Sequence, residues 1–249
     1  MGRRPPPGYC LHCLRWHDDL TWDHVFPQSW YPDDTPHGIE KWKIPACRPC
    51  NAEHGRSEEE LLLALGLCTS PADRHAAGIT NKVLRSIDPS AARNRRDRAA
   101  RLKKRARLLR EIRRTSVPPQ IGVLPNFGPQ PGLAYPHYAL VTIPARNLIK
   151  LGDKLVRGIT YLEFGAEISG RYMIETHVTH DENAAEIDAL VRSKGTQHYG
   201  GPGVTVVRAA AVDDPVVALF HIDIWGRLRL RASVLPRDGS ETAGPAEAT

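Results

Sequence analysis

The chain has 249 residues, of which 41% are hydrophobic, and its Lys and Arg residues outnumber Asp and Glu by 34 to 28. This length suits two domains better than one compact domain. The hydrophobic fraction excludes a largely disordered chain, and no stretch approaches the roughly 18 apolar residues that would suggest a membrane span. The net charge of +6 favours an anionic partner only where the basic residues gather on one segment.

Four of the five cysteines form two Cys-x-x-Cys pairs, Cys10/Cys13 and Cys47/Cys50. Two such turns are the usual way to present four sulfurs to a tetrahedral Zn²⁺ ion, so we expect a structural zinc site. Two unrelated pairs and a redox-active pair are the alternatives, but neither pair sits in the strand–helix–strand context of a redox motif. Metal-bound thiolates without a secretory signal indicate the cytoplasm. Cys68 is expected to be a small buried apolar residue.

An Asp-His dipeptide, Asp23-His24, lies between the two cysteine pairs, and Asn51 follows the last cysteine directly. An imidazole titrates near neutrality, so it is a natural base to activate water. A carboxylate and an amide carbonyl suit a hard divalent cation such as Mg²⁺ or Mn²⁺. Successive side chains of a strand point to opposite faces, so Asp23 and His24 can converge on one phosphate only where the backbone departs from a flat strand.

These motifs resemble the HNH endonuclease family. Residues 23–30 (DHVFPQSW) are similar to its Asp-His-hydrophobic-hydrophobic-Pro strand, and residues 45–51 (PACRPCN) to the second knuckle of its zinc-stabilised members. The resemblance implies two short strands and a helix around a metal, with structural zinc on the four cysteines. It also implies a catalytic divalent cation on Asp23 and Asn51, with His24 as the general base.

Two further positions bear on this resemblance. His54 lies one turn beyond Asn51 on the expected helix and is a candidate for contact with the metal or a phosphate; a solvated histidine is the alternative. Trp42 stands where the family has its middle Asn, which favours a second function, a catalytically inactive zinc module that binds nucleic acid. The intact Asp23, His24 and Asn51 disfavour it. A zinc-built scaffold for protein contacts is a third possibility.

Residues 57 to about 115 are expected to be helical. Residues 57–60 (SEEE) form a capping box followed by leucines, which indicates a helix start. Residues 91–114 contain strong helix formers and neither Gly nor Pro. The second helix is expected to dock on a neighbour through a narrow apolar stripe made of Leu102, Leu108, Leu109 and Ile112.

The second helix is also strongly basic. Between Arg93 and Arg114 twelve residues are Arg or Lys and only Asp97 and Glu111 are acidic. Such a segment is expected to bind the nucleic-acid backbone with strong salt dependence; a solvated helix face is the alternative. The candidates for contact with nucleic acid are Arg93, Arg95, Arg96, Arg98, Arg101, Lys103, Lys104, Arg105 and Arg107.

The remaining chain has the patterns of a second unit that contains both helices and strands. Dense Pro and Gly predict an extended linker. Trp225-Gly226 is expected to be the turn of a closing hairpin. β-branched or alternating stretches predict strands at 138–143, 172–178, 204–211, 216–224 and 228–235, with helices at 145–156 and 183–193.

The sequence therefore predicts an α+β protein that acts as a metal-dependent HNH endonuclease and hydrolyses phosphodiester bonds, most simply in double-stranded DNA. Restriction, defence against phage and mobile-element processing all use such nucleases. No membrane partner is expected. The C-terminal domain is expected to mediate a homodimer or to bind a regulatory partner. The predicted parts are a zinc-stabilised ββα-metal (HNH) domain at 8–67, a basic helical segment at 68–116, a linker at 117–136, a separate C-terminal α/β domain at 137–236 and a disordered tail at 237–249.

Overall fold

The computed structural model describes residues 4–69, 73–115, 138–178 and 184–237. The predicted linker at 117–136 and the predicted tail at 237–249, apart from Arg237, lie outside the described residues. The described chain combines helices with antiparallel strand pairs, which confirms the expected α+β mixture.

The N-terminal segment forms a hairpin followed directly by a long helix. Its elements are β1 (Gly8–Tyr9), β2 (Trp16–His17), β3 (Leu20–His24), the 3-10 turn η1 (Gln28–Trp30), β4 (Lys43–Cys47) and α1 (Arg48–Cys68). β3 and β4 keep a regular antiparallel register from the pair Leu20 and Cys47 to the pair His24 and Lys43. Pro49 fits the first turn of α1, because the backbone N–H groups of that turn have no helical partner.

The helix start predicted at 57–60 is wrong, because α1 begins at Arg48. Glutamates of this stretch pair with later parts of the chain and do not cap their own helix. Glu60, for example, accepts hydrogen bonds from Arg107 and Asn147, each at 3.0 Å. The acidic residues that suggested a cap therefore form a docking surface in the second half of α1.

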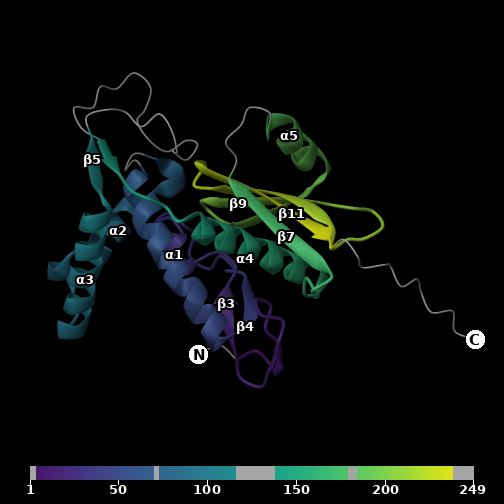
Figure 1. Ribbon diagram of the computed structural model, residues 1–249, viewed down its shortest axis with the longest axis horizontal. Coiled ribbons are helices and arrows are strands. Elements are labelled where there is room, and N and C mark those ends of the chain that lie inside the picture. The colour runs from purple at the N-terminus through teal and green to yellow at the C-terminus, as the bar shows by residue number, and fades with distance from the viewer. Residues whose placement is uncertain (1–3, 70–72, 116–137, 179–183, 238–249) are drawn as a thin grey trace, which may run out of the picture.

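A helical segment follows, and it contains the predicted basic helix. Its elements are η2 (Arg74–Ala76), α2 (Ile79–Ile87), η3 (Pro89–Ala91) and α3 (Arg95–Glu111). Asn94 begins α3 by accepting a backbone hydrogen bond of its first turn at 2.9 Å. Of the predicted apolar stripe, Leu108 is buried but Leu102 and Leu109 are exposed. α3 lies at one end of the molecule, away from the five-stranded sheet (Figure 1).

The C-terminal segment is an antiparallel sheet between two helices. Its elements are α4 (Ala145–Phe164), β7 (Tyr172–Val178), α5 (Ala184–Lys194), β8 (Thr196–Gly201), β9 (Val204–Ala210), β10 (Ala218–Ile224) and β11 (Leu228–Pro236). The strand order is β7-β11-β10-β9-β8, with α4 along one face and α5 over the other (Figure 1). A separate pair joins β5 (Arg113–Thr115) to β6 (Tyr138–Leu140).

Most of the predicted C-terminal elements are confirmed. The exceptions are the strand at 138–143, which is shorter and lies outside the sheet, and the helix at 145–156, which continues to Phe164. β8 was not predicted. Trp225 and Gly226 have positive φ angles of 57° and 64°, as expected for the tight turn between β10 and β11.

One hydrophobic core joins the N-terminal and C-terminal segments. Alternate residues of β10 and β11, such as Phe220 and Leu230, are buried against α4 and pack with Phe26. The Trp225 indole N–H donates to the backbone carbonyl of Trp30 at 3.0 Å, and the two indole rings lie 5.1 Å apart. The core is thus continuous across the predicted boundary, and the division into separate domains stays a prediction.

α4 approaches the end of β3 closely at Gly158, which lies against Val25. A Cβ atom at this position would lie 2.5 Å from Cγ1 of Val25, so only the absence of a side chain allows the helix to approach. Val25 is two residues beyond Asp23, and Lys154 lies one turn before Gly158 on the same helix. The close approach therefore brings Lys154 next to Asp23.

We predict that Gly158→Ala destabilises the protein by about 1–3 kcal/mol, because the added methyl group overpacks the contact with Val25. Gly55→Ala is the matched control, since Gly55 is also helical but has no atom within 4 Å of its missing Cβ. That change should stabilise the protein by about 0.5–1 kcal/mol through helix propensity. Urea denaturation measures both values, and equal effects of the two substitutions would contradict the close approach.

Candidate functional site

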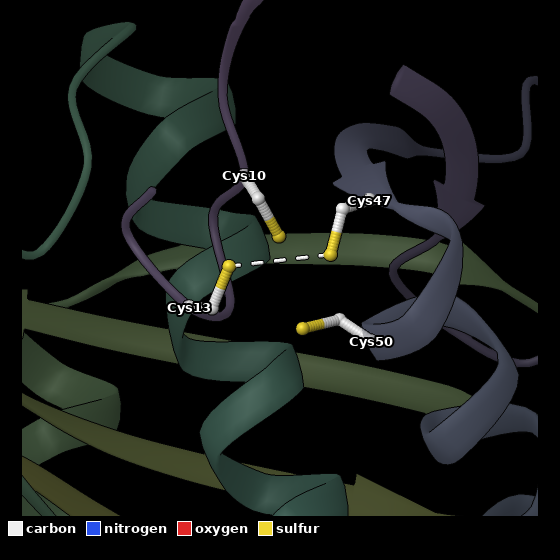
Figure 2. A group of neighbouring side chains, drawn as sticks. All are labelled: Cys10, Cys13, Cys47 and Cys50. Carbon is white, nitrogen blue, oxygen red and sulfur yellow. Dashed lines mark hydrogen bonds between the residues drawn. The ribbon is translucent and has the colours of Figure 1, made fainter. Parts of the chain in front are cut away.

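The four paired cysteines gather at one point. Cys10 and Cys13 come from the loop after β1, Cys47 ends β4, and Cys50 lies in the first turn of α1. The four side chains point toward one another (Figure 2), and their sulfur atoms all lie within 4.8 Å of one another. Tetrahedral thiolate coordination needs such a set, so the cysteines lie close enough to bind a metal ion, and zinc fits them best.

The turn that carries the first pair has an unusual backbone conformation. Leu14 has a φ of 57°, in the left-handed region that Leu rarely adopts. Its N–H donates to the carbonyl of Cys10 at 2.8 Å, which closes the turn around Cys13. A conformation of this kind persists where surrounding contacts determine it, and a metal ion on the two sulfurs would be such a contact.

The fifth cysteine is not part of this site. Cys68 lies at the end of α1 and is exposed, so the expectation of a buried apolar residue is wrong. In the described part of the chain, the four-cysteine set is the one group of His, Cys, Asp and Glu whose ligand atoms could hold a metal ion.

We predict one zinc ion per chain, lost on Cys10→Ser, because three thiolates and a hydroxyl bind zinc much more weakly than four thiolates. Loss of zinc should also unfold the hairpin and the start of α1. Cys68→Ser is the matched control and should keep both zinc and structure. Metal analysis by mass spectrometry and far-UV circular dichroism measure the outcome; a Cys10→Ser protein that retains stoichiometric zinc would contradict the assignment.

Asp23 lies on the face of β3 that meets α1, and both of its carboxylate oxygens are occupied. Oδ2 lies 2.9 Å from Nε2 of His12, a residue of the first zinc knuckle. Oδ1 accepts a hydrogen bond of 2.8 Å from Nζ of Lys154 on α4. Burial alone would raise the pKa of Asp23, but the hydrogen bond with His12 and the charge of Lys154 lower it below its usual value. Asp23 is therefore an ionised, buried carboxylate.

Two residues of α1 complete this buried polar cluster. Glu58 accepts a second hydrogen bond from the Lys154 ammonium group. Burial raises the pKa of Glu58, the negative charge of Asp23 adds to this, and Lys154 opposes it. The His54 ring stacks on His12 with 4.1 Å between ring centroids. Burial, together with the nearby His12 and Lys154, lowers the pKa of His54 to about 3, so His54 is a neutral packing partner at pH 7.

His24 lies on the other face of β3, as the regular strand register requires. It lines a cleft of about 840 Å³ together with Trp22 and the loop between η1 and β4. Burial and the charge of nearby Lys43 lower the pKa of His24, which keeps the imidazole neutral and able to accept a proton at pH 7. The backbone does not depart from a flat strand here, so Asp23 and His24 do not converge.

The cleft has charged and aromatic walls. Lys41, Lys43 and Lys82 line it together with the acidic residues Asp33 and Glu40, and Lys82 is paired with Asp33 at 3.0 Å. Trp22 is 40% exposed at the cleft wall. The arrangement can hold an anionic, planar group such as a nucleotide, through charge and through aromatic stacking.

Asn51 is close to β3 but makes a different contact from the expected one. Its amide nitrogen donates to Thr21 Oγ1 at 3.0 Å and to the carbonyl of Trp22 at 3.3 Å. Asn51 thus fixes the start of α1 against the hairpin. A divalent cation on Asp23 and Asn51 does not fit this arrangement, because both Asp23 oxygens already have partners and one of these partners is an ammonium group.

The basic residues of the predicted nucleic-acid helix divide into two sets. Arg101 donates to the backbone carbonyl of Arg85 in the last turn of α2, while Lys104 and Arg107 pair with glutamates of α1, so these three hold α3 in place. The other six project into solvent from α3 or from the turn before it; they are Arg93, Arg95, Arg96, Arg98, Lys103 and Arg105.

Several residues of the buried cluster around Asp23 and of the cleft were not predicted. His12 had a weak signal, since it is a polar residue inside a zinc knuckle. Lys154 had none, because its partner Asp23 lies 131 residues earlier in the chain. The cleft lysines come from the loop before β4, from β4 itself and from α2, and they belong to no motif.

Comparison of the chain with protein-family models, curated proteins and solved structures finds no match. Among the helices of the described residues, none combines the length and apolar character that crossing a bilayer requires.

Proposed function

We propose that the chain is a zinc-stabilised endonuclease of the HNH type, which hydrolyses phosphodiester bonds in DNA. The observation that carries the proposal is the position of His24. This neutral imidazole lies at the wall of a cleft that Lys41 and Lys43 also line, on a hairpin that the four-cysteine site joins to α1. The hairpin β3–β4 followed by α1 also agrees with the two strands and a helix that the resemblance implies.

His24 would act as the general base. It takes a proton from a water molecule, the water oxygen attacks phosphorus, the bond from phosphorus to the leaving oxygen breaks, and the leaving oxygen takes up a proton from solvent. Lys41 and Lys43 in the same cleft would bind the phosphate and offset its charge. The divalent cation on Asp23 and Asn51 that the resemblance implies does not fit the observed contacts, so no step of the proposed reaction uses it.

A second candidate function is a catalytically inactive zinc module that binds nucleic acid. The ion pair between Asp23 and Lys154 favours it, because the expected metal-binding carboxylate is already neutralised. The six solvent-facing basic residues before and along α3 would supply the binding surface under either function.

Cleavage of supercoiled plasmid DNA separates the two functions. The zinc-loaded protein is passed over a chelating resin to remove free cations and is then assayed with and without Mg²⁺ or Mn²⁺. We predict cleavage that falls by a factor of about 10²–10⁴ in His24→Ala, the usual contribution of a general base. His177→Ala is the control, because His177 is a highly exposed histidine of β7 outside the cleft. Binding without cleavage by folded wild-type protein would favour the inactive module.

The contribution of α3 is measured by the salt dependence of DNA binding. We predict that replacing Arg95, Arg96 and Lys103 with Gln weakens binding. The slope of log K against log salt should fall by about 0.9 for each phosphate that the variant no longer neutralises.

The matched control replaces three exposed basic residues of other elements, Arg15, Arg146 and Lys194, with Gln, which changes the net charge equally. If both triple variants lose affinity to the same extent, the effect belongs to overall charge and not to α3.

A further inference from the structure

The most unusual side chain outside the cleft is a fully buried lysine. The Lys154 side chain is 1% exposed, and two carboxylates surround its ammonium group. An ammonium ion buried without partners is very costly, so a lysine in this position stays charged by pairing. Asp23 supplies one partner from β3 and Glu58 the other from α1, which makes Lys154 the link between strand and helix.

The surroundings of Lys154 hold it rigidly in this place. One turn earlier on α4, Lys150 pairs with Glu53 of α1. Near the start of α4, buried Asn147 donates to a glutamate of α1 at 3.0 Å. One turn later, Gly158 allows the backbone of α4 to touch the hairpin. The same face of α4 therefore meets both α1 and the hairpin, and Lys154 lies between these contacts.

A divalent cation needs free oxygen atoms, and a neighbouring positive charge repels it. Mg²⁺ and Mn²⁺ take about six oxygen ligands. At Asp23 one oxygen bonds to Lys154 and the other to His12, and Glu58 is also bonded to Lys154. The negative charge that would attract a metal ion is thus already balanced within the chain.

We infer that Lys154 is the resident cation of the Asp23 site, and that Asp23 binds no divalent metal ion while α4 is docked on α1. Lys154 is a positioning residue: it fixes Asp23, and through it the end of β3 that carries His24. This inference concerns the site of the proposed function. It rests on that function only if Asp23 takes part in cleavage.

The test is a titration of the zinc-loaded protein with Mn²⁺, followed by electron paramagnetic resonance of the free ion. Wild-type protein is compared with Asp23→Asn, Lys154→Met and the double variant. We expect no Asp23-dependent Mn²⁺ site in the wild type. Lys154→Met should gain one site that binds Mn²⁺ roughly tenfold or more tightly than any wild-type site and that disappears in the double variant.

Lys150→Met is the matched control, because it removes a lysine of the same helix face whose partner Glu53 is a surface residue. It should behave like the wild type. A stoichiometric Mn²⁺ site in wild-type protein that Asp23→Asn abolishes would overturn the inference, and this result needs no lysine variant to fold. A folded Lys154→Met protein that gains no site would overturn it as well.

The plasmid assay, read together with the Mn²⁺ titration, distinguishes a failure of this inference from a failure of the proposed function. Cleavage that depends on His24 and needs no added divalent cation supports both. Cleavage that needs Mn²⁺ bound at Asp23 supports the nuclease and overturns the inference. Absence of cleavage together with absence of an Asp23-dependent Mn²⁺ site contradicts the nuclease and leaves the inference supported.

Discussion

The ion pair between Lys154 and Asp23 is the contact that joins the two halves of the molecule at the candidate site. The hydrophobic core also joins them, but apolar packing tolerates small displacements, whereas a buried ammonium ion needs its carboxylates within hydrogen-bond distance. The position of α4 relative to the hairpin is therefore fixed by charge. Gly158 permits the approach, and the acidic face of α1 completes it.

Two supports hold the β3–β4 hairpin, and both reach Asp23. The four cysteines connect the end of β4 to α1 and to the N-terminal loop, and His12 of that loop reaches one carboxylate oxygen. α4 brings Lys154 to the other oxygen. β3 stands between the buried polar cluster and the open cleft, so its two faces have different roles. One face carries Asp23 and holds the structure together, while the other presents His24 to whatever enters the cleft.

Local pattern predicted the features that depend on neighbours in the sequence. The spacing of the cysteines predicted their cluster, β-branched or alternating stretches predicted the strands of the sheet other than β8, and Trp225-Gly226 predicted a turn. Where a pattern had two physical uses, the prediction failed: the glutamates after Ser57 can cap a helix or dock one, and here they dock α3 and α4. Lys154 could not be predicted, since its role depends on a partner 131 residues away.

A double-mutant cycle of Asp23→Asn and Lys154→Met, followed by the free energy of unfolding, tests the central ion pair most directly. Each single change leaves a buried charge with fewer partners and should cost about 3–5 kcal/mol. The double variant removes both charges, so its loss should be well below the sum of the two single losses. Losses that add to within about 0.5 kcal/mol would show that the two residues act independently and would contradict the account.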